Sequence, residues 1–349
     1  MKRSLLLSLC LLGIALACGP RGGGSGDPGS SRPGSSTRPG TPATEAPEPA
    51  ASHSFPTVSI PSVYADDSDS RTDYVLEHYW DAFLAGKGAT TPVSILGVFD
   101  EDVEQALANY IQVLSNVKAA ATPDDKAPLI RARKSVSRLF DKLEAVQKKD
   151  TSANTYLRLT EMVSRYLYDP NSPLRDEDLY LPFVEAMESS PYTRSDMRNA
   201  YRHEIQMCRT NPFGSKVPDI RFKDVQGHKG SLYAINADYT MLFFSNPGCE
   251  SCKGIIQAVM SRGYIESKIS AGKLAIVNVY IDEEVDKWRD YSINYPSCWV
   301  NGYDYTFSLR DSGQYDIRAI PSLYLLDGQK RVIMKDAPTE RVLAFFDKI

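Results

Sequence analysis

Cys249 and Cys252 are separated by two residues and lie where a strand pattern gives way to a helical one. Residues 239–244 read YTMLFF, a largely apolar run that is typical of a strand buried on both faces. Residues 249–262 follow with a helical pattern, so the loop at 245–248 is expected to join a strand to a helix. The first cysteine is therefore predicted to lie at a helix N-terminus, facing unpaired backbone N–H groups.

This position predicts a reactive thiol. The positive end of a helix dipole stabilises a thiolate, and the thiolate is the nucleophile of disulfide exchange. Cys252, one helical turn later, is expected to be less exposed and close enough to form a disulfide with Cys249. We expect Cys249 to attack a partner disulfide and Cys252 to resolve the mixed disulfide that results. No cofactor is expected besides this redox-active disulfide.

Zinc binding and a purely structural disulfide are the two other uses of a C-x-x-C pair. Zinc needs two further ligands, and neither a second C-x-x-C nor a pair of histidines at ligand spacing follows in the sequence. A structural disulfide that closes so short a loop removes little entropy from the unfolded chain. The pair is accordingly interpreted as redox-active, and no metal site is predicted.

Downstream of residue 210 the sequence predicts strands and helices in alternation. Strands are expected at 219–225, 231–235, 239–244, 274–280, 321–326 and 331–334, helices at 249–262 and 339–346, and helical and loop material at 281–319. Two parallel strands and then a hairpin, with helices between them, predict a central mixed sheet flanked by helices. This α/β domain is assigned to residues 211–349.

Residues 56–210 are predicted to form an all-helical domain whose function the sequence does not indicate. Asp100 is expected to cap a helix that runs to about residue 114. Residues 122–125 read TPDD, which combines a hydroxyl cap, a proline in the first turn and acids at the positive helix end. Further helices are expected at about 155–168, 176–187 and 195–208. The fold class is therefore α followed by α/β.

The N-terminus resembles an export signal with a lipid attachment site. Lys2 and Arg3 precede a short apolar run that ends in small residues, which predicts a signal peptide at 1–17. The sequence ALACG at 15–19 resembles the lipobox of bacterial lipoproteins, in which the cysteine, here Cys18, receives the lipid. Secretion without lipid, with Cys18 an incidental cysteine, is the alternative.

Residues 18–55 are predicted to be a disordered tether. The segment consists mainly of Gly, Pro, Ser, Thr and Ala, and residues 19–54 contain no large apolar residue. Such a composition cannot bury enough surface to offset the entropy of ordering. No later run is apolar enough for a transmembrane helix, so attachment to the membrane is expected through the lipid alone. The predicted location is the cell envelope, on a membrane facing the periplasm or at the cell surface.

Composition excludes one class of partner. The chain has 349 residues, a formal net charge of −4 and 24% charged residues, which are values of an ordinary globular protein of about two domains. No basic stripe with interleaved aromatic residues occurs, so nucleic acid is not expected as a partner.

Residues 212–349 resemble the membrane-associated thiol:disulfide interchange branch of the thioredoxin superfamily. The matching features are the hairpin at 219–232, LFF at 242–244, CESCK at 249–253 and IPSLYLLD at 320–327. The whole mature chain is similar to a two-domain group of Gram-negative lipoproteins in which an uncharacterised helical domain comes first. Signatures of that group are LYDPNSP at 167–173 and WVNGYD at 299–304.

The resemblance implies roles for four residues. Cys249 would be the nucleophile and Cys252 the resolving cysteine. In thioredoxin folds the proline before the third core strand has a cis peptide bond beside the first cysteine, and this corresponds to Pro321 here. Pro321 and Ile320 would contact the substrate strand.

Three residues depart from the pattern of the superfamily. Gly248 precedes the first cysteine, where the family often has tryptophan, and Phe243 occupies the place of a buried acid that transfers protons. Asp238 or Glu283 would supply that acid instead, and the sequence does not choose between them. The third departure is Glu250, whose carboxylate should oppose thiolate formation at Cys249 and so favours a reductant or isomerase over a strong oxidant.

The prediction that follows is a membrane-tethered thiol-disulfide oxidoreductase. Its expected partners are exported proteins with thiols or disulfides and an unidentified electron donor in the membrane. The alternative is a non-enzymatic lipoprotein whose helical domain binds a partner, with a vestigial or structural disulfide at 249–252. Thiol peroxidase is disfavoured, because Leu242 and Asn246 stand where that class has proline and threonine or serine. Cys208 and Cys298 are either small buried residues or a disulfide between the domains.

Overall fold

The computed structural model describes residues 54–64, 66–151 and 153–349. The predicted signal peptide, the lipidation site Cys18 and nearly all of the tether lie outside the described residues. Those that are described belong to one compact unit, Pro49–Ile349. Within this part of the chain, no helix combines the length and the apolar character that crossing a membrane requires.

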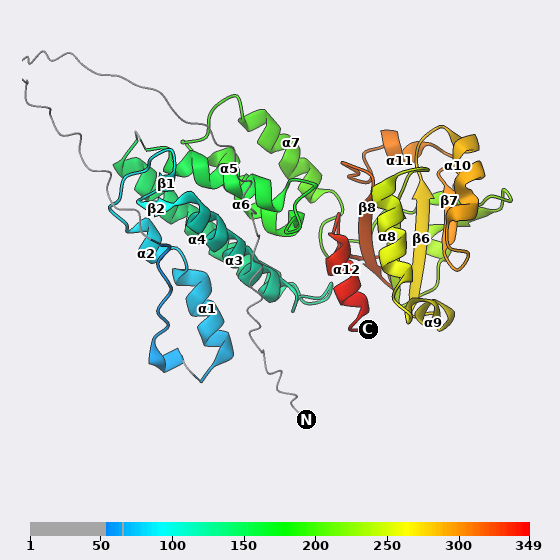
Figure 1. Ribbon diagram of the computed structural model, residues 1–349, viewed down its shortest axis with the longest axis horizontal. Coiled ribbons are helices and arrows are strands. Elements are labelled where there is room, and N and C mark those ends of the chain that lie inside the picture. Colours follow the sequence, from blue (N-terminus) through cyan, green and yellow to red (C-terminus); the bar gives the residue numbers. More distant parts are fainter. Residues whose placement is uncertain (1–53, 65, 152) are drawn as a thin grey trace, which may run out of the picture. The chain divides into compact units, whose positions relative to one another are not determined.

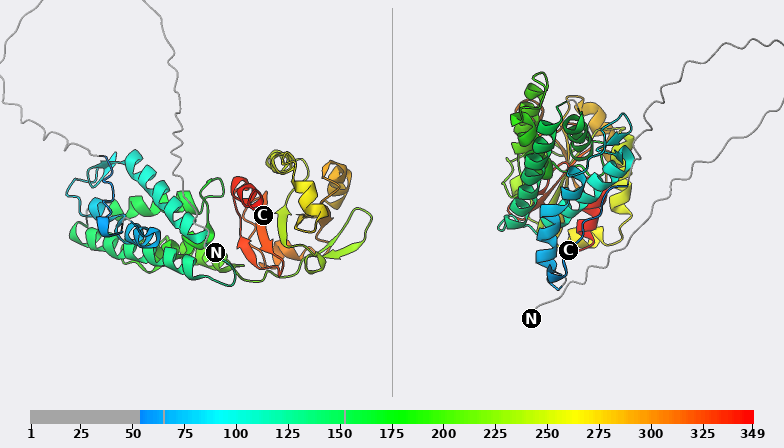
Figure 2. Two further views of the ribbon diagram at one scale, coloured as in Figure 1. Left: turned by 90° about the horizontal axis from the view of Figure 1, so that it is seen from below. Right: turned by 90° about the vertical axis from the view of Figure 1, so that its left-hand side faces the viewer.

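Helices make up the first part of the described chain, as the sequence predicts (Figure 1). They are α1 (Ser68–His78), α2 (Asp81–Leu84), α3 (Asp100–Lys118), α4 (Ala127–Lys149), α5 (Thr155–Leu167), α6 (Glu177–Ser189) and α7 (Arg198–Arg209), with a 3₁₀ turn at Ser62–Tyr64 and a short hairpin of β1 (Ser94–Ile95) and β2 (Val98–Phe99). The long helices α3 and α4 lie side by side (Figure 1 and Figure 2). Buried residues at three- and four-residue spacing, such as Leu107, Tyr110 and Leu114, form their contact face. The Tyr110 hydroxyl is 2.7 Å from that of Ser135.

Two predicted helix starts differ from the structure. Asp100 is the first residue of α3, and Phe99 occupies the cap position. Helix α4 begins at Ala127, about four residues later than the TPDD motif predicts. Thr122 and Asp125 instead close a turn through two backbone hydrogen bonds of 2.9 and 3.1 Å. The threonine hydroxyl accepts the N–H of Asp125 and so caps this turn rather than the helix.

The second part contains a seven-stranded sheet in the order β4-β3-β7-β6-β5-β8-β9. Its strands are β3 (Arg221–Lys223), β4 (Lys229–Ser231), β5 (Tyr239–Phe244), β6 (Leu274–Tyr280), β7 (Val300–Tyr303), β8 (Ser322–Asp327) and β9 (Val332–Met334), and its helices are α8 (Glu250–Met260), α9 (Ile265–Ser270), α10 (Val285–Tyr291), α11 (Ser308–Asp311) and α12 (Thr339–Phe346). Strands β5, β6 and β7 are parallel, and β8 is antiparallel to β5. This arrangement is the predicted mixed sheet flanked by helices.

The sheet is buried on both faces. Met241 and Phe243 of β5 point to the face that α8 and α12 cover (Figure 1), and they share a cluster with Val259 of α8. Leu242 and Phe244 point to the other face, where Leu309 of α11 packs. This alternation is the period of two that a strand imposes. Burial on both sides explains why β5 is apolar at nearly every position.

Two stretches of the sheet domain differ from the expected pattern. The sequence pattern predicts helical and loop material at 281–319, yet strand β7 within this stretch pairs in parallel with β6 through Val300, Asn301, Gly302 and Tyr303. Polar and glycine positions in a four-residue strand give no clear periodicity, so the sequence pattern misses it. The expected strand at 231–235 is a 3₁₀ turn, Leu232–Ala234, because the Ser231 hydroxyl accepts the N–H of Tyr233 at 3.2 Å.

Candidate active site

Cys249 is held at the N-terminus of α8 by the loop that leaves β5. It is the N-cap residue of the helix, and its Sγ accepts the backbone N–H of Cys252 at 3.1 Å. The loop before it contains Gly248 at a φ of +73°, a left-handed conformation that glycine adopts at low cost. The structure therefore places the sulfur on a free N–H group of the first helical turn, which stabilises a thiolate.

The two cysteines form the predicted disulfide and differ in exposure. Their Cα atoms are 5.2 Å apart and the sulfurs are bonded. Cys249 is half-buried, whereas Cys252 is 2% exposed and packs in the cluster that contains Phe243 and Trp299. A partner can reach the first sulfur but not the second. This asymmetry fits the expected division into a nucleophile and a resolving cysteine, which stays a prediction.

The segment before β8 lies beside the same loop. The Ile320–Pro321 peptide bond is cis. Ser322 pairs with Phe244 across the antiparallel strands, so Pro321 lies opposite the start of the loop that leads to Cys249. Ile320 packs against the cluster that also contains both cysteines. Among the described residues, neither the N–H nor the C=O group of Ile320 has a hydrogen-bond partner, so both are free to pair with an extended peptide.

A groove of about 570 Å³ runs past Ile320 and Pro321. Helix α8 lines it with Ser251, which lies between the two cysteines, and with Ile255. The segment 319–321 lines a second side. A third side belongs to the helical part, through the loop at 170–175 between α5 and α6. The structure thus brings helix α8 at Ser251, the cis-proline segment and the helical part to one groove beside the disulfide, which we call the redox groove.

Comparisons with known proteins identify both parts of the chain. The model of a domain of unknown function, DUF5106, matches residues 31–211. A thioredoxin-like protein from Bacteroides caccae, known from its crystal structure, is 32% identical, and the match covers 85% of this chain and 99% of that chain with a TM-score of 0.69. The chain is a thioredoxin-like protein of the DUF5106 family. Its helical part is the DUF5106 domain, and its sheet part is the thioredoxin-like domain.

Other solved structures match a smaller share of the chain. The C-terminal domain of an uncharacterized Bacteroides fragilis protein is 37% identical and matches 40% of this chain and 99% of that chain, with a TM-score of 0.38. The thioredoxin domain of a thiol-disulfide oxidoreductase from Bacteroides vulgatus is 21% identical and matches 39% and 96%, with a TM-score of 0.35. A comparison with proteins of curated function finds no match.

The acid expected near the redox pair is not found at either proposed residue. Phe243 fills the buried position and stacks edge-on against Trp299, with ring centroids 6.1 Å apart. Asp238 is exposed and precedes β5, at the opposite end of the strand from Cys249. The side chain of Glu283 is 75% exposed and pairs with Arg310 at 3.6 Å.

Asp282 is the carboxylate that the structure connects to the loop before Cys249. It accepts a hydrogen bond of 2.9 Å from the Asn246 side chain. No local motif marks Asp282, but the strand topology does. Asp282 follows the end of β6, and the carboxyl ends of the parallel strands β5 and β6 meet at one edge of the sheet.

Glu250 acts on Cys249 more weakly than the sequence alone suggests. Its side chain is 86% exposed, and Lys253 lies 4.0 Å from its carboxylate. Water screens the charge of the Glu250 carboxylate at such an exposed position, and the ammonium group of Lys253 offsets part of that charge.

A buried ionic network fastens the cis-proline segment to the DUF5106 domain. The side chain of Lys335 is 3% exposed and forms an ion pair with Glu177 of α6 at 2.6 Å. It also donates hydrogen bonds to the carbonyl groups of Met207 and Thr210. Asp316 lies 3.7 Å from the same ammonium group. These contacts anchor the chain on both sides of β8.

Arg318 is the second cation of the network. It lies 2.7 Å from Asp336 and 3.2 Å from Glu177, and its guanidinium group stacks over the ring of Tyr168 at 4.2 Å. Arg318 is three residues before Pro321, so the network fixes the approach to the cis-proline. The sequence does not mark the charged residues of this network, because charged residues are ordinarily exposed.

Glu177 predicts a pH dependence of stability. Burial raises the pKa of Glu177 from 4.5 to about 7, against the attraction of Lys335 and Arg318. The folded protein therefore binds a proton that the unfolded chain releases, so stability falls as the pH rises through this window. Between pH 5 and pH 8 the free energy of unfolding should fall by about 2–3 kcal/mol on this account. Urea denaturation at both pH values should show a smaller fall for Glu177→Gln. An equal fall in that variant would assign the effect to other groups.

Cys208 and Cys298, the other two cysteines in the described part of the chain, are free thiols. Cys208 is buried in the core of the helical part, and burial raises the pKa of its thiol. Cys298 is half-buried beside the cluster around Cys252. The structure therefore contains no disulfide between these two cysteines, and they are small packing residues.

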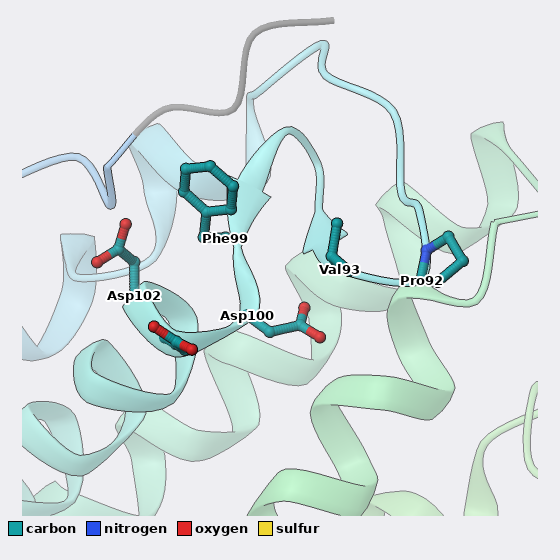
Figure 3. Close-up of a pocket in the computed structure, with 6 residues that line it drawn as sticks. Pro92, Val93, Phe99, Asp100 and Asp102 are labelled. Atoms are coloured by element: carbon teal, nitrogen blue, oxygen red, sulfur yellow. The ribbon is translucent and has the colours of Figure 1, made fainter. Parts of the chain in front are cut away.

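A separate hollow of about 560 Å³ lies in the helical part, at the start of α3. Figure 3 shows Pro92 and Val93 on one side of it and Phe99 and Asp102 on the other. Asp100 is held there by an ion pair with Arg158. None of the lining residues belongs to the thioredoxin-like domain, so the hollow is no part of the redox site.

Proposed function

We propose that this chain is a membrane-tethered thiol-disulfide oxidoreductase that acts on exported proteins. The observation that carries the proposal is the state of Cys249, a half-buried N-cap residue of α8 that is bonded to a buried Cys252. A purely structural disulfide needs neither the difference in burial between the two cysteines nor the free backbone groups of Ile320.

The proposed reaction moves two electrons from the pair to a substrate. The Cys249 thiolate attacks one sulfur of the substrate disulfide, and the other substrate sulfur leaves as a thiolate. Cys252 loses its proton and attacks Sγ of Cys249, which releases the second substrate thiol and closes the Cys249–Cys252 bond. A dithiol donor must then reduce the pair before another turnover, and we propose that this donor lies in the membrane.

We propose reduction or isomerisation rather than oxidation as the direction. The helix N-terminus stabilises the Cys249 thiolate, no histidine adjoins it to add to this effect, and Glu250, although screened, opposes it. A thiolate that is only moderately stabilised leaves the pair a reductant. The lipid on Cys18 and the tether would keep the domain near its donor at the envelope membrane.

Redox titration of the Cys249–Cys252 pair against glutathione tests this proposal. We expect a reversible two-electron couple with a potential of about −180 mV or lower, in the range of reductases and isomerases. Alkylation followed by mass spectrometry measures the fraction of each state. A pair that dithiothreitol fails to reduce would instead indicate a structural bridge in a non-enzymatic binding protein.

A further inference from the structure

The loop at 169–175 between α5 and α6 is part of a sequence signature that the redox chemistry does not explain. The loop is fixed by its own hydrogen bonds. Asp169 accepts the backbone N–H of Asn171 at 2.8 Å, and the Ser172 hydroxyl donates to the carbonyl of Tyr166 at 2.5 Å. Pro170 and Pro173 restrict the backbone further. The loop is therefore built as a rigid element rather than as a flexible connection.

The same loop is attached to the thioredoxin-like domain at both of its ends. Arg175 donates to the carbonyl of Asp336 at 2.8 Å, and Arg318 donates to the carbonyl of Tyr168 at 2.5 Å. Arg175 belongs to the DUF5106 domain and Arg318 to the thioredoxin-like domain. The loop consequently has one fixed position relative to the cis-proline segment.

Its exposed residues face the redox groove. Pro170, Asn171 and Pro173 are exposed, and they line the same groove as Ser251 and Ile320. A polypeptide that approaches Cys249 along Ile320 therefore has the DUF5106 domain on its other side. Disulfide exchange at Cys249 and Cys252 does not itself require a second domain beside the groove.

The lining of the groove selects for a particular chemistry. Most of its residues are apolar, including Ile255, Ala258 and Pro338. The charges of Arg175 and Asp336 are 3.6 Å apart and offset each other. Within the described residues, Glu340 is the lining charge without an ion-pair partner. An extended segment with an apolar side chain beside its cysteine fits such a surface, and an acidic one does not.

We propose that the loop at 169–175 is a specificity wall of the redox groove, which selects extended polypeptide segments with apolar residues next to the reactive disulfide. This inference rests on the proposed oxidoreductase function. It gives the DUF5106 domain a direct part in choosing the substrate.

Charge substitutions at Pro173 test the proposed wall, because this residue is exposed and lines the groove. Three variants of the full chain, Pro173→Gln, Pro173→Glu and Pro173→Lys, remove the proline equally and differ mainly in charge. The pre-reduced proteins are mixed with disulfide-linked dimers of a short peptide whose residue next to the cysteine is leucine, lysine or glutamate. The measured quantity is the second-order rate constant of reduction.

We expect the unaltered protein to reduce the leucine peptide about five-fold faster than the glutamate peptide. Relative to Pro173→Gln, the lysine-to-glutamate rate ratio should rise about three- to five-fold in Pro173→Glu and fall by a similar factor in Pro173→Lys. Lys134→Glu, on an exposed position of α4 that does not line the groove, should leave the ratio unchanged. Reduction of hydroxyethyl disulfide, which is small and uncharged, should be the same in Lys134→Glu as in the unaltered protein, and it gives the charge-independent rate of each Pro173 variant.

Two other outcomes would contradict the proposed role of the loop, and they distinguish that role from the oxidoreductase function. If all three Pro173 variants reduce the peptides with one common ratio, the loop does not contact the substrate, although the oxidoreductase function stands. If the unaltered protein reduces neither the peptides nor hydroxyethyl disulfide, the proposed function is wrong and the wall with it.

Discussion

Replacing Cys249 with serine is expected to lower the rate of disulfide reduction at least about a thousand-fold. A serine hydroxyl is not ionised at neutral pH, so the helix N-terminus has no thiolate to stabilise. Cys252 cannot take over the attack, because its side chain is 2% exposed within an apolar cluster. The measurement is the reduction of a protein disulfide such as that of insulin, with dithiothreitol as the donor.

Cys298→Ala is the matched control for this substitution. Cys298 is a free thiol of the same domain and packs beside the same cluster. Its loss should change the rate less than about two-fold, because it takes no part in the exchange. Comparable losses in both variants would mean that the Cys249 effect comes from folding and not from chemistry.

Replacing Lys335 with methionine is expected to lower the free energy of unfolding by about 3–5 kcal/mol. The substitution removes the ammonium group between Glu177 and Asp316 and leaves two carboxylates in a buried site. It also removes the donor to the carbonyl groups of Met207 and Thr210. Urea denaturation followed by circular dichroism measures the change.

Lys134→Met gives the comparison for an exposed lysine, and it should change the free energy of unfolding by less than about 0.5 kcal/mol. Adding Glu177→Gln to Lys335→Met should recover part of the loss, because one uncompensated charge is then removed. If Lys335→Met has the stability of the unaltered protein, the network does not hold the two domains together.

The redox pair and its junction could be predicted from the sequence because their signals are local. An apolar run marks β5, since a parallel strand covered on both faces needs apolar residues at successive positions. The helix that follows is amphipathic, and a short loop must join the two. The cysteines lie at that junction in the sequence and also in the structure.

The remaining features of the site depend on contacts between distant residues. Glu177 meets Lys335 and Tyr168 meets Arg318, pairs separated by more than 140 positions along the chain. No local pattern distinguishes a lysine that becomes buried in such a pair from one that is exposed. The link between Asn246 and Asp282 also exists only once β5 and β6 are paired.

In the helical domain too, local patterns predict the helices but not the contacts between distant residues. Its helices are readable from their apolar periodicity, and most of their bounds fall within a few residues of the prediction. The signature at 167–173 is visible in the sequence, but its position on the redox groove follows only from the contacts of Arg175 and Arg318. The proposed role of the DUF5106 domain in substrate choice could therefore not be predicted from the sequence.

Trapping of the mixed disulfide tests the central claim most directly. A Cys252→Ser variant retains the Cys249 thiolate but cannot resolve, so incubation with an oxidised cysteine peptide should leave one peptide bound per chain. Peptide mapping by mass spectrometry under non-reducing conditions should place that peptide on Cys249, and Cys249→Ser/Cys252→Ser should bind none. A Cys252→Ser protein that forms no adduct, or carries it on Cys298, would contradict the assignment of Cys249 as the nucleophile.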